Sequence, residues 1–251
     1  MELNADGSAT EASLTGFYWE PPLSSTSYFK PEYPYSFPLL TTNTGPTTPD
    51  FSKIRDYVVL GEIERARYAA FGASPMHLAQ NDVTTTRSRI LKNTIDWIVQ
   101  TDTTEALNVV LAHMPQNSDH NGTVSWLKNA YSDMVSHNDY QDCDGDLLAD
   151  CLTEDVDLMI MFQADANVSD TTAIRDAVSD AMDQGIALVF LRKFNENTML
   201  GDTILDLIRA GSSTPTYPYP TSMLNFSPAE YVLGWEPHYV SQIEGMVRGI
   251  E

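Results

Sequence analysis

The chain has 251 residues, 42% of them hydrophobic, and 35 Asp and Glu side chains outnumber 14 Lys and Arg for a formal net charge of -21. That length suits one α/β domain with irregular flanks better than two full domains. The negative charge repels phosphate backbones and anionic bilayers, which excludes nucleic acid as a partner. No apolar run reaches the roughly 18 residues of a transmembrane helix.

The start of the chain, MELNADGSATEASLTG, lacks the basic and apolar regions of a signal peptide. Two interpretations follow: a cytoplasmic protein, or a fragment whose export signal lies outside this chain. The two cysteines, Cys143 and Cys151, fit a local disulfide made in an oxidising compartment, or two reduced thiols. The polar, turn-prone residues between them favour the disulfide.

Residues 1–55 predict an irregular arm rich in Pro, Ser, Thr and aromatic residues. Proline fixes φ and removes a backbone donor, so we expect no regular ladder or helix in this segment. Its aromatic side chains offer two interpretations. They pin the arm onto the domain, which we favour, or they form a surface on which sugars stack.

Residues 56–211 predict an α/β domain in which strands and helices alternate. The expected strands are DYVVLG (56–61), RARYAAFG (65–72), LNVVLAH (107–113), DLMIMF (157–162) and IALVFL (186–191). The expected helices cover 84–100, 123–135, 169–185 and 199–211, with Gly185 and Gly211 as stop signals. This alternation predicts right-handed crossovers and a doubly wound, mostly parallel, flavodoxin-like sheet. Residues 212–251 predict a linker and a C-terminal helical segment packed on the domain.

Ligands of open α/β sheets bind outside the carboxyl ends of the strands. Polar residues follow three of the expected strands, and they form a candidate strand-end cluster of His113, Asp165, Arg192 and Lys193. Most folds of this class carry polar residues there, so an ordinary solvated edge is the competing interpretation.

Catalytic signatures are missing from the sequence. It has no HExxH, GxGxxG, Walker A or GxSxG motif. Ser74 with His77 in FGASPMH makes a poor nucleophile elbow, because Pro75 follows the serine and the second glycine is missing. The five histidines lack metal-ligand spacing; His113 and His120 are the closest pair, and as loop histidines we expect them to face solvent.

An acidic run surrounds the cysteines in QDCDGDLLADC. Calcium takes six to eight oxygen ligands, and a turn at Gly145 would let alternating carboxylates supply several of them. The run resembles the loop of thrombospondin type 3 repeats, which implies the ligands Asp142, Asp144, Asp146 and Asp150. A disulfide-closed acidic loop without metal is the favoured alternative. We expect this loop to enter the strand DLMIMF at its amino end, away from the ligand-binding edge.

Several segments together resemble a non-catalytic domain of large secreted zinc metallopeptidases, the ImpA or accessory-colonization-factor type related to enhancins. They are RSRILKNTIDWIVQ, LNVVLAHMPQ, the Cys143 to Cys151 loop, DVDLMIMFQAD and AMDQGIALVFLRK. The resemblance covers about Asp56 to Gly211. The metallopeptidase domain in turn resembles glutamine amidotransferase-like and ThuA-like sheets. The family's HExxH and the amidotransferase nucleophile are both absent here, so neither set of catalytic residues can be carried over.

The resemblance implies an extracellular or cell-surface accessory domain, without catalysis or cofactor of its own, in a bacterial metalloprotease that attacks mucin-like glycoproteins. Its partners would be other domains of the parent protein and the glycoprotein. One alternative is a calcium-stabilised adhesion or glycan-binding module. Another is a cytoplasmic hydrolase with a degenerate site at Ser74, His113 or Asp165.

Overall fold

The computed structural model describes residues 28–30, 32, 35–43, 55–72, 86–100, 107–113, 118–131, 140–143, 147–162, 171–192, 198–213 and 223–226. The strands are β1 (Tyr28–Phe29), β2 (Ser36–Asn43), β3 (Arg55–Ile63), β4 (Ala66–Phe71), β5 (Val109–Ala112), β6 (Tyr140–Cys143), β7 (Leu158–Phe162), β8 (Ala187–Leu191), β9 (Ser212–Ser213) and β10 (Met223–Phe226). The helices are α3 (Thr86–Val99), α4 (Ser118–Ala130), α5 (Leu148–Cys151), α6 (Thr171–Gln184) and α7 (Thr198–Leu207).

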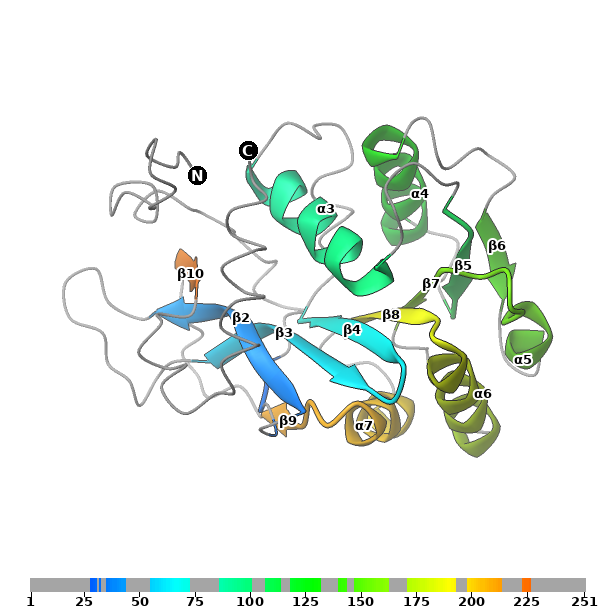
Figure 1. Ribbon diagram of the computed structural model, residues 1–251. Helices are drawn as coiled ribbons and strands as arrows, with labels where there is room; N and C mark the ends of the chain where they lie inside the picture. Colours follow the sequence, from blue (N-terminus) through cyan, green and yellow to red (C-terminus); the bar gives the residue numbers. More distant parts are fainter. Residues whose placement is uncertain are drawn as a thin grey trace.

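Within these residues the strands form one sheet in the order β10-β2-β3-β4-β8-β7-β5-β6, with β1 and β9 off this path (Figure 1). The strands from β4 to β6 in this order are all parallel to one another. The stretch β6-β5-β7-β8 follows the order 2-1-3-4 of a flavodoxin-like sheet, and β4, although it comes earlier in the chain, takes the fifth place. The predicted doubly wound α/β fold is confirmed.

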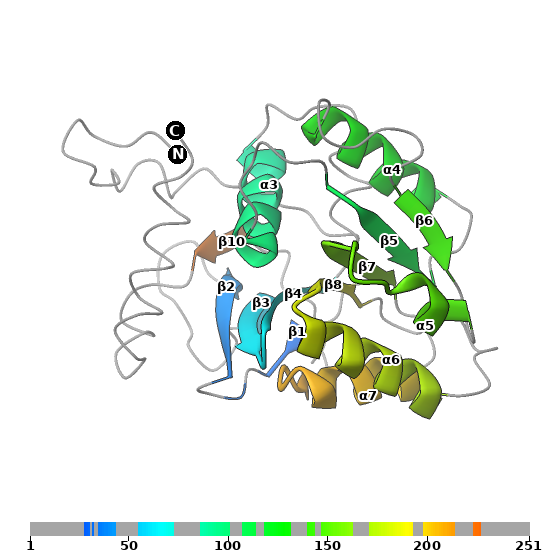
Figure 2. The same cartoon turned by 45° about the vertical axis from the view of Figure 1, so that its right-hand side comes forward.

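Helices cover both faces of the sheet. Figure 2 shows α3 and α4 on one side and α5, α6 and α7 on the other. Strand side chains alternate between the two cores: Ile160 and Val189 pack with the α3 and α4 residues Leu91 and Trp126, while strand residues of opposite parity pack with α6 and α7. Two-sided burial explains the continuous apolar runs of β7 and β8, in which every residue is buried.

Local sequence signals explain the helices. In α6 the buried residues Ile174, Val178, Ala181 and Met182 follow the helical period, so one stripe faces the sheet. Gly185 has a φ of 96° just beyond the helix, a conformation that glycine adopts without steric cost, and this confirms the predicted stop. Helix α3 likewise buries one face, on which Leu91, Thr94 and Ile95 are all 0% exposed.

An antiparallel wing extends the sheet beyond β4 and corrects the prediction that residues 1–55 form no ladder. Strand β2 lies in that segment and pairs antiparallel with β3, with register shifts on either side of Leu40, next to Pro38. Irregular pairing accommodates a proline that cannot donate to a ladder. Strand β10, inside the predicted linker and helical segment of residues 212–251, pairs with the other edge of β2. The predicted C-terminal helices lie outside the described residues.

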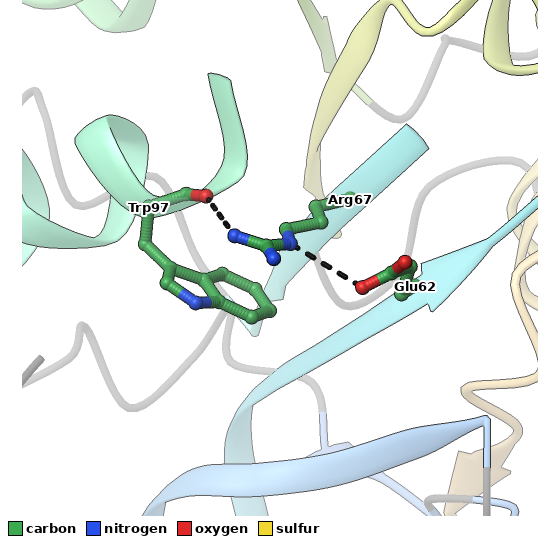
Figure 3. A network of polar contacts seen from close by, with 3 residues as sticks. All are labelled: Glu62, Arg67 and Trp97. Carbon is green, nitrogen blue, oxygen red and sulfur yellow. Dashed lines mark hydrogen bonds and ion pairs between the residues drawn. The ribbon is translucent and has the colours of Figure 1, made fainter. Parts of the chain in front are cut away.

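The β3–β4 hairpin is fastened to α3 by Arg67, as Figure 3 shows. Its guanidinium lies 4.6 Å from the centroid of the Trp97 ring, and Nη1 donates to the Trp97 carbonyl oxygen at 3.1 Å. Nε donates to Oε2 of Glu62, across the hairpin, at 3.3 Å. Stacking and directional hydrogen bonding by one guanidinium therefore hold hairpin and helix together.

Candidate functional site

The carboxyl ends of the parallel strands meet at one edge of the sheet, which we call the carboxyl edge. The register places Phe71 opposite Leu191, Leu191 opposite Phe162, and Ala112 opposite Cys143. The residues that follow these strands are therefore carried to the same edge. This is the side on which ligands of open α/β sheets bind.

His113 follows β5 at the point where the strand order reverses. The side chain is buried, and the backbone has a φ of 54°, in the left-handed region that is sparsely populated by residues other than glycine. The backbone N–H of His113 donates to the carbonyl oxygen of Cys143 at 3.1 Å, which continues the pairing of β5 with β6 by one residue. The surrounding structure thus holds His113 in an unfavourable conformation at the switch point, where functional residues are often found.

The disulfide between Cys143 and Cys151 is formed, as predicted, and it lies at the carboxyl edge. Cys143 is the last residue of β6, and Cys151 ends the short helix α5. The chain does enter β7 at its amino end, at Leu158, but Cys143 lies at the carboxyl end of β6, which corrects the expectation that the cysteine loop is away from the ligand edge. Strand β6 was not predicted, because its four residues, YQDC, have no apolar pattern.

His120 and Asp142 form a polar pair beside the disulfide. His120 Nε2 lies 2.9 Å from Asp142 Oδ1, and the His120 side chain is 7% exposed against 47% for Asp142. His120 belongs to helix α4 and is buried, which corrects the expectation of a solvent-facing loop histidine. His113 is buried as well. The pair joins residues 22 positions apart, and no local sequence pattern links them.

Arg192 follows β8 and forms a second polar group at this edge. Its backbone N–H donates to the Phe71 carbonyl oxygen at 2.9 Å, and its Nη2 donates to Oδ1 of Asp202 in α7 at 2.9 Å. Burial lowers the pKa of the guanidinium, and the charge and hydrogen bond of Asp202 offset part of that effect. Arg192 was predicted from the sequence and Asp202 was not, because an exposed acidic residue inside a helix is common.

The structure describes two members of the predicted strand-end cluster, His113 and Arg192. His113 and Arg192 both lie at the carboxyl edge, but strand β7 separates β5 from β8. Since neighbouring strands are about 4.8 Å apart, the two backbones are about 10 Å apart. Asp150 lies exposed on α5. The remaining candidates lie outside the described residues: Ser74, His77, Asp144, Asp146, Asp165 and Lys193.

Two findings concern metal binding and membrane spanning by the described residues. Among the described residues, no three His, Cys, Asp or Glu side chains come together in a way that could hold a metal ion. In the same part of the chain, no helix has the length and apolar character needed to cross a bilayer. What the edge does offer is hydrogen bonding, through a buried guanidinium and a histidine–carboxylate pair.

Comparisons with known proteins point to one family. The family described as "Immunomodulating metalloprotease N-terminal domain" matches residues 34–216. A search of curated proteins finds no match. The structure of IMPa from Pseudomonas aeruginosa in complex with an O-glycopeptide is similar, with a TM-score of 0.56, 16% identity, and coverage of 90% of this chain and 24% of that one.

A second similar structure is the IMPa metallopeptidase in complex with T-antigen, with a TM-score of 0.55, 17% identity and the same coverage of both chains. At these identities the likeness shows the shared fold. The chain spans about a quarter of the length of these proteins, 24% in each case.

Proposed function

The chain belongs to the immunomodulating metalloprotease N-terminal domain family, and from that premise we propose that it is a non-catalytic accessory domain of an exported bacterial metalloprotease that cleaves glycoproteins. The observation that carries the proposal is the match to an N-terminal domain over residues 34–216. The similar IMPa structures contain an O-glycopeptide and T-antigen, which supports glycoproteins as the substrate class.

The accessory role is supported by the sequence and the geometry together. The chain contains no HExxH motif, so the family's zinc ligands have no counterpart in it. The groups at its carboxyl edge are engaged in contacts between elements: His113 pairs with β6, Asp142 contacts α4, and Arg192 contacts α7. Such contacts suit a scaffold that presents substrate to another domain, or packs against it.

Export is supported by the disulfide. Cystines persist in oxidising compartments and are rare in the cytosol, where thiols are kept reduced. The disulfide between Cys143 and Cys151 joins strand β6 to helix α5 in the folded domain. We therefore propose an extracellular or cell-surface location, and mucin-like glycoproteins as the natural target. The likeness to glutamine amidotransferase-like and ThuA-like sheets stays a prediction, as do the adhesion and hydrolase alternatives.

The proposal is tested by incubating the purified chain with an O-glycosylated peptide and following cleavage by mass spectrometry. We expect no cleavage by the chain alone, with or without added zinc. Turnover that scales with enzyme concentration, and that survives a further purification step, would overturn the accessory assignment. An esterase substrate serves as the matching test of the hydrolase alternative.

The genomic reading frame supplies a second test. If the chain is one domain of a larger peptidase, the frame that encodes it continues into an HExxH motif downstream. A complete frame without that motif would contradict the proposed parent protein while leaving the family membership of this domain intact.

A further inference from the structure

We propose that the carboxyl edge at the end of β8 carries a carboxylate-binding site whose donor is the Nη1 group of Arg192. The Arg192 side chain is 9% exposed, and its Nη2 is engaged by Asp202. Its Nη1 is buried and has no hydrogen-bond partner within the described part of the chain. A buried donor on an ionised group is costly to leave unsatisfied, so an acceptor placed there is strongly favoured.

Charge compensation at Arg192 is incomplete. Asp202 is 53% exposed, so water screens its attraction for the buried guanidinium. Desolvation outweighs the effect of Asp202, and the pKa of Arg192 is lowered as a result. A second negative group bound at Nη1 would restore the compensation, because opposite charges attract more strongly in a buried, low-dielectric place.

Helix α7 adds to the positive character of this place. It begins at Thr198, reaches Asp202 within its first five residues, and has no acidic side chain in its first turn. The first N–H groups of a helix have no partner inside it, and they form the positive end of the helix dipole. The buried guanidinium and this helix end are independent features, and the Arg192–Asp202 contact brings them together.

A carboxylate fits this site better than a phosphate does. Guanidinium groups bind carboxylates through short, charge-assisted hydrogen bonds, and Nη1 offers two N–H donors. Asp202 already engages the other arm, so only one positive charge is shared between two anions. A monoanion adds less repulsion from Asp202 than a dianion does, and the chain as a whole is strongly acidic, at -21. The proposal stands independently of the proposed function.

The first experiment measures thermal unfolding of the 251-residue chain in sodium acetate, in sodium glucuronate as a carboxylated sugar, and in sodium phosphate, with sodium chloride at matched ionic strength. At a concentration about ten times Kd we expect acetate to raise Tm by about 3 to 6 °C over chloride. Glucuronate acting and acetate failing would identify a sugar acid as the ligand. No rise with either carboxylate overturns the proposal.

Variants assign the effect to Arg192. Arg192→Lys keeps the charge but loses the planar fork, and we expect it to weaken acetate binding about tenfold. Arg192→Met should abolish the shift. Asp202→Asn removes the competing charge, so acetate should bind more tightly to this variant than to the wild type. A purely structural ion pair predicts lower stability in Asp202→Asn without any gain in acetate affinity, and that result overturns the proposal.

Arg175→Gln is the matched control, because Arg175 is an exposed arginine paired with Asp176 on α6. It should leave the acetate response unchanged, and a lost response would show that acetate binds elsewhere. If the Arg192 variants do not fold, NMR of the wild-type arginine side chains decides the matter. Acetate must then shift the Arg192 resonances in a saturable way, and their failure to move counts against the site.

Discussion

His120 Nε2 lies 2.9 Å from Asp142 Oδ1, and this contact joins helix α4 to strand β6, which leads into the acidic loop. Its histidine is 7% exposed and its carboxylate 47% exposed. We expect Asp142→Ala to lower the free energy of unfolding by about 1 kcal/mol, the usual net value of a partly buried hydrogen bond. Urea denaturation measures the loss. Asp150→Ala, an exposed position on α5, is the matched control, and equal losses in the two variants would show that the contact contributes nothing.

The same contact bears on calcium. Because His120 already engages Asp142, a calcium ion would have to compete for one of the four carboxylates that the acidic run offers. We expect millimolar calcium to leave Tm equal to its value in chelator. A ligand that binds only the folded state must raise Tm, so a calcium-dependent rise that Asp142→Asn abolishes would establish the calcium-loop alternative.

The disulfide closes a short loop between two buried sulfurs. Replacing both Cys143 and Cys151 by serine should lower stability by about 2 to 3 kcal/mol, mainly because the unfolded chain gains freedom. Chemical denaturation of the double variant measures this loss, and reduced wild type provides the comparison without mutation. Mass spectrometry after alkylation of the denatured, unreduced protein should detect no free thiol. Two alkylated cysteines would remove the support for export.

Gly61 in β3 lies beneath the side chain of Tyr68, which is its partner on β4. A Cβ atom at position 61 would collide with the Tyr68 ring and with the backbone oxygen of Tyr35. Since Tyr68 is 0% exposed, it has no room to move. We expect Gly61→Ala to cost about 2 to 3 kcal/mol, as overpacked sites do.

A double-mutant cycle with Tyr68→Ala tests the cause of that loss. If the clash with the ring accounts for it, Gly61→Ala should cost much less in the Tyr68→Ala background. An unchanged cost would place the strain on the Tyr35 backbone instead.

Tyr131 donates to Oδ1 of Asp96 on α3 at 2.8 Å. Burial, and then the Asp96 charge and hydrogen bond, raise the pKa of Tyr131 well above its ordinary value. The folded state therefore holds this proton more tightly than the unfolded state does. The stability it contributes is complete below about pH 10 and is lost as the pH rises toward the folded-state pKa.

We expect Tyr131→Phe to be about 1 kcal/mol less stable than wild type at neutral pH. That difference should shrink above about pH 10, where only the wild type loses the contribution of Tyr131. Urea denaturation at several alkaline pH values measures both variants. A difference that stays constant with pH would contradict the raised pKa of Tyr131.

The sequence determined the central layers of this protein. The apolar runs of β7 and β8 read as strands buried on both faces, and residues 169–185 read as a helix that stops at Gly185. The cysteine pairing was predictable as well, because only two cysteines exist and eight positions separate them. These features follow from periodicity and spacing, which are local properties.

Only the tertiary structure decided which short strands join the sheet and which polar side chains pair at the carboxyl edge. Strand β6 has four residues of mixed polarity, and β2 contains a proline, so both exist because a neighbouring strand accepts their hydrogen bonds. The pairs His120–Asp142 and Arg192–Asp202 depend on how helices dock against the carboxyl edge. Side-chain partners from separate elements leave no period in the sequence, since their proximity arises only when the sheet order and register are set.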